Sequence, residues 1–316
     1  AGSTGYIGIQ LIKLLIKHKY INIKYLCGSS SVGKDISSYD KSIKRNKLPK
    51  IKKFHKNLLN KIDIVFTALP NGQAQIISKL LGKNTTLIDL SADFRLEKSY
   101  EYFKYYKIKH KAKSNINKSK YSIPEFSYNK LNNTKIIACP GCYPTSILLP
   151  LIPLLQRKLI INKNIIIDSK SGYSGAGRGV HKKYKHKNLY ESISAYGLFN
   201  HRHNSELKQE LNKSSKNPVD FIFTPHLSPM FRGILSTIYL ELNKNVKVNQ
   251  ITKYLKEFYK NKRFVKIAKK NSLISTNDII NTNICKISVQ EDSRSNKIII
   301  LSAIDNLIKG GAGQAV

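Results

Sequence analysis

A glycine-rich stretch at the start of the chain constrains its fold more than any other feature. Gly2-Ser3-Thr4-Gly5-Tyr6-Ile7-Gly8 has the spacing G-x-x-G-x-x-G and leads into residues 9–16, whose apolar pattern predicts a helix packed on a sheet. Glycines at this place form a tight turn and let the backbone approach a pyrophosphate, which the start of the helix attracts. The stretch therefore predicts a dinucleotide-binding domain. A strand should precede such a loop, and the given sequence does not include it.

The next predicted strand, residues 21–26, ends in a loop that bears on the type of dinucleotide. Ser29, Ser30 and Lys34 lie in this loop. A fold that binds NAD usually has Asp or Glu here, which holds the ribose 2′-hydroxyl. Hydroxyl groups and a lysine instead suit a 2′-phosphate. NADP is therefore expected rather than NAD, and an ordinary serine loop is the alternative.

Alternating strands and helices extend the α/β prediction. Residues 61–72 are predicted to form a strand that ends in a turn, residues 74–81 a helix and residues 86–90 a further strand. This alternation is typical of a parallel sheet, in which ligands bind beyond the carboxyl ends of the strands. Residues 69–72 and 91–95 are therefore expected beside the cofactor.

Cys142 lies in a turn that suits a nucleophile. Pro140, Gly141 and Pro144 surround it, between a predicted strand and a predicted helix. A sulfur atom near the positive end of a helix favours the thiolate form. The alternative is a buried structural cysteine, because free cysteines are often core residues. Cys139 creates the spacing of a dithiol redox motif with Cys142, but the position in the middle of the chain disfavours a thioredoxin-like domain.

Two features beyond Cys142 suit the same chemistry. Residues 169–179 combine glycines and serines with Arg178, which predicts an anion pocket built from N–H groups and hydroxyls, or else a plain linker. His201 and His203 precede a predicted helix at residues 205–211. One of them is expected to be a general acid and base beside the thiol, and the sequence does not decide which. Zinc is disfavoured because no third ligand has a suitable spacing, and a surface pair without a role is the other alternative.

The second half of the chain contains more predicted strand than helix, which implies an α+β domain with a mostly antiparallel sheet. The fold class is therefore α/β, with a Rossmann-type NADP-binding domain at residues 1–141 and 302–316. Residues 142–301 are expected to form the catalytic, substrate-binding and oligomerisation domain. The predicted elements of this second domain are strands at residues 164–167, 221–227, 233–242, 283–287 and 297–301 and a helix at residues 251–259.

Composition excludes several classes of protein. The formal net charge is +36, but the basic residues are scattered lysines rather than a basic tail, so a solvated surface is favoured over a nucleic-acid site. No apolar run reaches eighteen residues, which excludes a predicted membrane span. Four cysteines do not resemble a disulfide framework and suit a reducing cytoplasm. Residues 97–120, rich in Lys and Tyr without a clear period, are expected to be a surface excursion.

Together these segments resemble the N-acetyl-gamma-glutamyl-phosphate reductase family of the semialdehyde dehydrogenase superfamily, whose members use NADPH in arginine biosynthesis. The resemblance covers nearly the whole chain. It departs from the family at Cys139 and at Asn71, which replaces a histidine often found after that proline. The segments that carry it are Gly2–Gly8, Leu90–Arg95, Pro140–Thr145, Lys170–Gly172, Ser174–Gly177, His201–His203, Thr224–Leu227 and Ser302–Val316.

The resemblance implies a reaction and a set of site residues. Cys142 would attack the γ-carbonyl of an acyl phosphate and form a thioester, which hydride from NADPH would reduce to a semialdehyde. His203 or His201 would transfer the proton, with His203 preferred. The substrate would be a small acyl phosphate, no metal is implied, and a homo-oligomer without nucleic-acid or membrane partners is expected. The implied cofactor-binding residues are Gly2, Ser3, Thr4, Gly5, Tyr6, Ile7, Gly8, Ser29, Ser30, Lys34, Leu69, Pro70, Ser171, Gly172 and Asn306, and the implied substrate-binding residues are Arg95, Ser174, Gly175, Arg178 and Arg232.

Two other functions remain open at this point. A related acyl-phosphate reductase would keep the same chemistry with an aspartyl phosphate or the longer amino-adipate analogue. From a different class, a basic nucleic-acid-binding protein on the same scaffold would owe its affinity to the positive charge.

Overall fold

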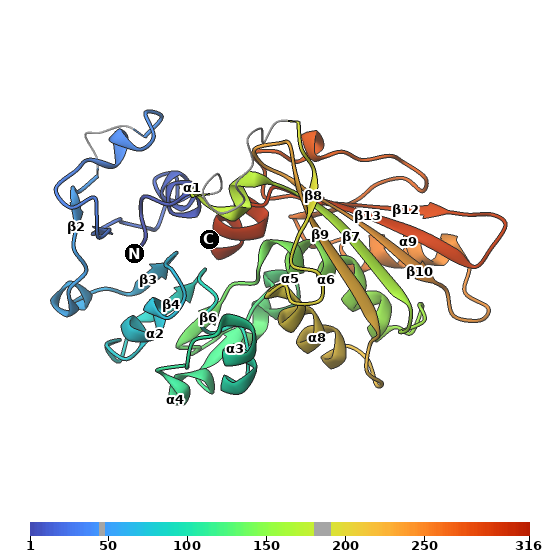
Figure 1. The fold of residues 1–316 in the computed structure, drawn as a ribbon, viewed down its shortest axis with the longest axis horizontal. Helices are drawn as coiled ribbons and strands as arrows, with labels where there is room; N and C mark the ends of the chain where they lie inside the picture. Colours follow the sequence, from blue (N-terminus) through green and yellow to red (C-terminus); the bar gives the residue numbers. More distant parts are fainter. Residues whose placement is uncertain (44–47, 180–190) are drawn as a thin grey trace. The chain divides into compact units, whose positions relative to one another are not determined.

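The computed structural model describes residues 1–43, 48–179 and 191–316, which form two compact units (Figure 1). Unit 1 comprises residues 1–140 and 311–316, and unit 2 comprises residues 141–310. The chain thus returns to the first unit at Gly311 rather than at the predicted Ser302. The reason is that the last strand of unit 2 continues to Ile304, and Asn306 bonds to other loops of that unit.

Unit 1 contains a four-stranded parallel sheet in the order β3-β4-β6-β5 and a separate parallel pair, β1-β2. Of the predicted strand at residues 21–26, only Leu26 lies in a strand, β1, which pairs with β2, whereas residues 21–25 have no strand structure. The strands are β1 (Leu26–Cys27), β2 (Ile51–Lys52), β3 (Ile64–Thr67), β4 (Thr86–Asp89), β5 (Ser119–Tyr121) and β6 (Ile136–Ala138), and the α-helices described in this unit are α1 (Tyr6–Leu15), α2 (Gln73–Ser78), α3 (Ser99–Tyr106), α4 (Lys113–Ile116), α5 (Pro124–Ser127) and α10 (Gly313–Ala315).

Residues 97–120, predicted to be a surface excursion without a clear period, are mostly exposed but contain two helices that were not predicted, α3 and α4. Tyr102 and Tyr106 are one helical turn apart, are both buried, and stack with ring centroids 4.6 Å apart. They pack against Ala92 and Leu96. Two aromatic rings therefore supply the buried face of α3, whereas Tyr100, Phe103 and Lys104 are exposed.

Unit 2 contains a seven-stranded sheet in the order β11-β12-β13-β10-β7-β9-β8. Most neighbouring strands are antiparallel, as predicted, and the pairs β7-β9 and β11-β12 are parallel. Residues 169–172 belong to β7, so the predicted loop begins later than expected. The strands are β7 (Ile165–Gly172), β8 (Ser194–Ala195), β9 (Phe221–Ser228), β10 (Ile234–Glu241), β11 (Val265–Ile267), β12 (Cys285–Glu291) and β13 (Lys297–Ile304), and the α-helices described here are α6 (Cys142–Gln156), α8 (His203–Lys213) and α9 (Val248–Phe258).

The two faces of this sheet differ. Helix α6 is buried from Tyr143 to Leu155 and packs on β10 and β13, with α8 and α9 beside it (Figure 1). On the other face, Ile166, Ile222 and Tyr239 are 46%, 49% and 42% exposed. They occupy matching positions on β7, β9 and β10, so they form one row across the sheet. Unit 2 therefore has one helix-covered face and one open face with exposed apolar side chains.

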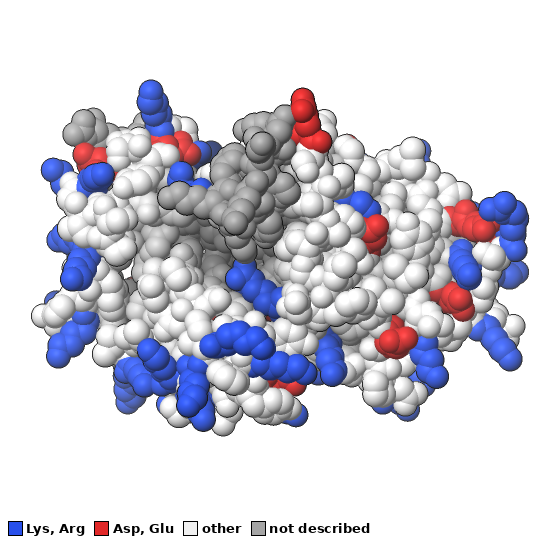
Figure 2. Space-filling model, in the orientation of Figure 1, with Lys and Arg blue, Asp and Glu red and all other residues white. Residues whose placement is uncertain are grey.

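Lysine and arginine side chains are spread over the visible face of the molecule, with fewer acidic side chains between them (Figure 2). Within the described parts of the chain, no helix is both long and apolar enough to cross a membrane.

Candidate functional site

Cys142 is the first residue of α6, and Gly141 is its N-cap. The thiol therefore lies at the positive end of a 15-residue helix, a place that favours a thiolate. Cys142 is partly exposed, whereas the other three cysteines are buried. Gly310 packs directly against it, since a Cβ added at Gly310 would lie 2.6 Å from the Cys142 Cβ. The predicted position of Cys142 between a strand and a helix is confirmed.

Cys139 has the opposite environment. It packs with Leu11, Leu15 and Ala312 in the core of unit 1, and burial raises the pKa of its thiol to about 12. A thiol with this pKa stays protonated at neutral pH and is a poor nucleophile. The described residues contain no disulfide, so Cys139 and Cys142 do not form a dithiol bridge here.

His203 lies against the residue that precedes the candidate nucleophile. It is the first residue of α8 and is buried. A Cβ added at Gly141 would overlap His203 Nε2 and would lie 2.7 Å from Cδ2. Glycine at position 141 thus lets the imidazole ring approach the backbone next to Cys142.

Glu206, one turn further along α8, connects these groups and was not predicted. It is fully buried, and one carboxylate oxygen accepts a hydrogen bond of 2.9 Å from the Gly141 N–H. The other oxygen lies 3.8 Å from His203 Nε2. The spacing of three residues between His203 and Glu206 places both on one helix face, and this spacing was the signal available in the sequence.

His201 has a different environment from His203. Its ring is enclosed by Tyr143, Tyr196 and Phe223, with centroids 5.3–5.7 Å away. Its Nδ1 atom accepts a hydrogen bond of 3.1 Å from the His203 N–H. Nδ1 therefore carries no proton, and the ring holds the start of α8. No group of three or more His, Cys, Asp or Glu side chains suited to a metal ion occurs within residues 1–43, 48–179 and 191–316.

The predicted anion loop is held by Asn306, four residues before Gly310. The Asn306 amide donates a hydrogen bond of 3.0 Å to Ser174 Oγ and accepts one of 2.8 Å from the Gly233 N–H. Gly175 lies beside the same amide, since a Cβ added there would be 3.5 Å from Asn306 Nδ2. Asn306 thus joins two loops of unit 2, and its predicted contact with nicotinamide stays a prediction.

The predicted substrate-binding arginines have three different surroundings. Arg178 is exposed on the glycine loop. Arg232 forms an ion pair of 3.0 Å with the buried Asp305, so its charge is neutralised by the protein. Arg95 is buried in unit 1 and donates hydrogen bonds to the carbonyl groups of Leu90 and Cys139. These contacts make Arg95 a clamp between the ends of β4 and β6, and its role in substrate binding stays a prediction.

The glycine loop of unit 1 has the close contacts expected of a dinucleotide site. Gly2 has a φ of 84°, and a Cβ added there would overlap the Ala68 carbonyl group. The N–H groups of Gly2 and Ser3 both donate to the Cys27 carbonyl at the end of β1. The loop is thereby held at the carboxyl ends of β1 and β3, where ligands of such sheets bind. The predicted 2′-phosphate residues, Ser29, Ser30 and Lys34, are all exposed.

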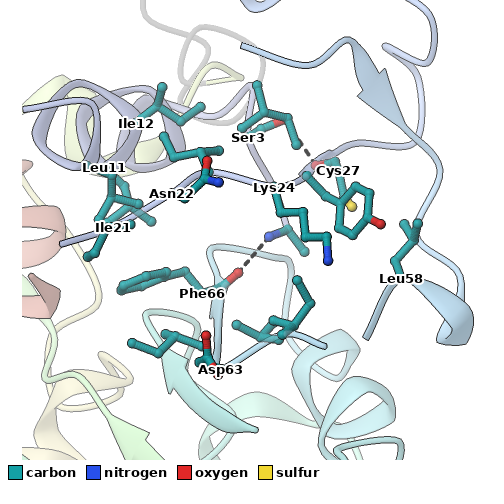
Figure 3. Close-up of a pocket in the computed structure, with 18 of the residues that line it drawn as sticks. Ser3, Leu11, Ile12, Ile21, Asn22, Lys24, Cys27, Leu58, Asp63 and Phe66 are labelled. Atoms are coloured by element: carbon teal, nitrogen blue, oxygen red, sulfur yellow. Dashed lines mark hydrogen bonds between the residues drawn. The ribbon is translucent and has the colours of Figure 1, made fainter. Parts of the chain in front are cut away.

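A cavity of about 470 Å³ lies below this loop, between residues 20–27 and residues 58–66 (Figure 3). Leu11 and Ile12 of α1 contribute apolar side chains to its wall. The cavity is lined by Leu26 and Cys27 of β1 and by Ile64, Val65 and Phe66 of β3, and none of the residues around Cys142 lines it.

Asp89, the last residue of β4, has a carboxyl group with a raised pKa. Asp89 is fully buried, which raises the pKa of its carboxyl group to about 6, although a hydrogen bond from Thr67 opposes this shift. Its Oδ1 atom accepts hydrogen bonds from Thr67 and Ser91, and Oδ2 has no hydrogen-bond partner among the described residues. The folded state therefore favours the protonated form.

This shift predicts a pH-dependent stability. A raised pKa stabilises the fold at low pH, and the contribution is lost as the pH rises through about 6. Asp89→Asn cannot ionise, so relative to wild type its free energy of unfolding should increase by about 2 kcal/mol between about pH 4.5 and about pH 7.5. Urea denaturation at both pH values measures this. Equal pH dependence in the two proteins would show that Asp89 titrates normally.

The two parts of the chain match two families. Residues 1–134 match the semialdehyde dehydrogenase NAD binding domain, and residues 142–306 match the semialdehyde dehydrogenase dimerisation domain. The N-acetyl-gamma-glutamyl-phosphate reductase of Desulforamulus reducens is 41% identical over 324 residues, which cover 100% of this chain and 92% of the relative. The probable chloroplastic N-acetyl-gamma-glutamyl-phosphate reductase of Oryza sativa is 38% identical over 315 residues, which cover 100% of this chain and 76% of the relative.

Solved structures confirm the predicted fold class. Aspartate semialdehyde dehydrogenase from Francisella tularensis has a TM-score of 0.72 at 14% identity, covering 99% of this chain and 96% of that chain. The same type of enzyme from Candida albicans, solved with NADP, has a TM-score of 0.69 at 18% identity, covering 99% and 94%. At these identities the likeness shows the fold, an α/β domain followed by a domain with a mixed sheet.

Proposed function

Because this chain belongs to the N-acetyl-gamma-glutamyl-phosphate reductase family, we propose that it reduces N-acetyl-gamma-glutamyl phosphate with NADPH, releasing N-acetylglutamate 5-semialdehyde and phosphate in arginine biosynthesis. The observation that carries the proposal is the placement of Cys142 at the start of α6, with His203 against the preceding glycine. A partly exposed thiol at a helix N-terminus beside an imidazole is a suitable nucleophile for acyl transfer.

Cys142, His203 and Glu206 of unit 2 have different roles in the proposed reaction. Cys142 Sγ, as thiolate, attacks the γ-carbonyl carbon, and the bond from this carbon to the phosphate oxygen breaks, which leaves a thioester. NADPH, when bound, supplies the hydride that reduces the thioester. His203 gives a proton to the carbonyl oxygen and takes it back as the carbon–sulfur bond breaks to release the aldehyde. Glu206 is a positioning residue, because it holds the Gly141 N–H and faces the His203 ring.

An assay in the oxidative direction tests the proposed substrate. Purified protein should reduce NADP in the presence of phosphate and N-acetylglutamate 5-semialdehyde, and omitting phosphate should abolish the signal. Aspartate semialdehyde and the amino-adipate analogue should react at least about 10²-fold more slowly in kcat/KM, because substrate contacts of about 3 kcal/mol would be lost. Faster reaction with either analogue would assign the chain to a related acyl-phosphate reductase.

Lys34 provides a test of the preference for NADP. If the 2′-phosphate binds beside Lys34, then Lys34→Glu should lower kcat/KM for NADPH by about 10-fold or more and leave the value for NADH unchanged or higher. Lys17→Glu is the matched control, because Lys17 is also exposed but follows the far end of α1. Steady-state kinetics with both cofactors measure the ratio. If Lys34→Glu and Lys17→Glu lowered kcat/KM for NADPH equally, the cause would be the change in overall charge and not a contact of Lys34 with the 2′-phosphate.

We also propose that the open face of the unit 2 sheet is the surface through which two copies associate. The row formed by Ile166, Ile222 and Tyr239 supports this, as does the match to a dimerisation domain. Ile222→Asp should shift the protein toward monomer in sedimentation velocity, because an unpaired charge would be buried in the interface. The control is Leu273→Asp, at a residue 85% exposed outside this row. A monomeric wild type, or an unchanged oligomer in Ile222→Asp, would contradict the assignment.

We further propose that the protein is located in the cytoplasm. This reducing compartment suits a site that depends on a free thiol, and the described residues contain no disulfide.

A further inference from the structure

The loop after β4 holds the loop after β3 through Asp93. This residue is 1% exposed, and its carboxylate accepts hydrogen bonds of 2.7 Å from the Gly72 N–H and 3.3 Å from the Gln75 N–H. Gly72 is the N-cap of α2 and has no side chain with which to bind these groups. Asp93, eighteen residues beyond Gln75, therefore supplies the cap that the helix itself lacks.

The carboxylate of Asp93 is itself held in place. Tyr102 donates a hydrogen bond of 2.6 Å to it, and the Gln75 side-chain amide donates one of 3.2 Å. His110 Nε2 lies 2.9 Å from the Asp93 carbonyl oxygen. All four groups that donate to the carboxylate in these contacts are neutral, so they hydrogen-bond the carboxylate without neutralising it, and burying it costs free energy. Such an arrangement suits a residue whose purpose is to fix the geometry of its neighbours.

A second residue of the same loop acts on the other end of residues 69–72. Ser91 Oγ accepts a hydrogen bond of 3.1 Å from the Leu69 N–H. Leu69 and Pro70 are the residues of this loop predicted to contact the cofactor. Residues 69–72 are thus held at their start by Ser91 and at their end by Asp93.

We propose that Asp93 is a positioning residue for the cofactor: it does not contact NADPH but fixes residues 69–72 in the conformation that binds it. The inference rests on the proposed function, since it requires that NADPH binds beside this loop. If Asp93 only stabilised the fold, removing its contacts with Gly72 and Gln75 would weaken NADPH binding no more than removing its contact with Tyr102.

Asp93→Asn tests this role, because the amide keeps the shape but directs a donor at groups that also donate. The KM for NADPH should rise by about 10-fold or more with kcat changed by less than about threefold, which corresponds to about 1.4 kcal/mol of lost binding. Tyr102→Phe is the matched control: it removes a hydrogen bond to the same Asp93 oxygen that the Gly72 N–H contacts, but the Tyr102 side chain belongs to α3 and not to residues 69–75. It should leave the KM within about twofold.

Amide hydrogen exchange of residues 69–75 without cofactor gives an independent measurement. Exchange should be faster in Asp93→Asn and unchanged in Tyr102→Phe. If Asp93→Asn does not fold, Ser91→Ala replaces it, and both its KM for NADPH and its exchange should rise. Equal effects of the Asp93 and Tyr102 substitutions, or an unchanged KM with wild-type activity present, would overturn the positioning role alone. A wild type that does not turn over NADPH would overturn the proposed function.

Discussion

Replacing Cys142 by serine is expected to lower the rate of NADPH-dependent reduction by about 10⁴-fold or more. The physical reason is that a serine hydroxyl at the start of α6 does not ionise near neutral pH, whereas this position favours a thiolate. Steady-state kinetics give the rate, and thermal unfolding should show little change, since Cys142 is partly exposed.

Cys139→Ser is the matched control for this substitution. The two cysteines are three residues apart, but the Cys139 thiol is buried and its pKa is raised to about 12. Its substitution should leave kcat within about threefold while lowering stability by about 1–2 kcal/mol, because a polar hydroxyl replaces a buried thiol. A large loss of activity in Cys139→Ser, with activity retained in Cys142→Ser, would reverse the assignment of the two thiols.

Gly141→Ala should have the second largest effect, with kcat lowered by about 10²-fold, because displacement of a catalytic group by about 1 Å has an effect of this size. The added Cβ would overlap the His203 ring and push it from its place. Backbone strain is not the cause, since Gly141 has φ −67° and ψ 159°, a conformation open to any residue. Steady-state kinetics of the wild type and of Gly141→Ala give the ratio of their kcat values.

A double-mutant cycle isolates this effect. In a His203→Ala background the space beside Gly141 is empty, so Gly141→Ala should lower kcat by less than about threefold further. Gly82→Ala, where a Cβ would have an ordinary contact of 3.5 Å, is the control glycine and should leave kcat unchanged. Additive effects of Gly141→Ala and His203→Ala would contradict the view that the glycine acts through the imidazole.

The features predicted best from the sequence are those carried by short local patterns. The glycine loop precedes a helix as expected, and Cys142 begins another, because turn residues and apolar periodicity determine both locally. The helix α3 was missed because its buried face consists of tyrosines, which carry a weak apolar signal. The buried row of Tyr102 and Tyr106 becomes apparent only when Ala92 and Leu96 pack on it.

The parts of the site that could not be predicted depend on contacts between distant segments. Glu206 meets Gly141 across 65 residues of sequence, and a glutamate in an amphipathic helix usually faces solvent. The family resemblance implied that Arg95 binds the substrate, but its described hydrogen bonds go to two strand ends of its own unit. Asn306 was identified as a site residue, yet its bonds to Ser174 and Gly233 follow from the tertiary fold alone.

The covalent step is tested most directly by trapping the acyl group on the protein. Cys139→Ser protein mixed with N-acetyl-gamma-glutamyl phosphate in the absence of NADPH should gain the mass of one N-acetylglutamyl group. Tandem mass spectrometry should locate it on Cys142, hydroxylamine should remove it, and NADPH should discharge it as the semialdehyde. The absence of any adduct under conditions of full activity, or an adduct on a residue other than Cys142, would contradict the account.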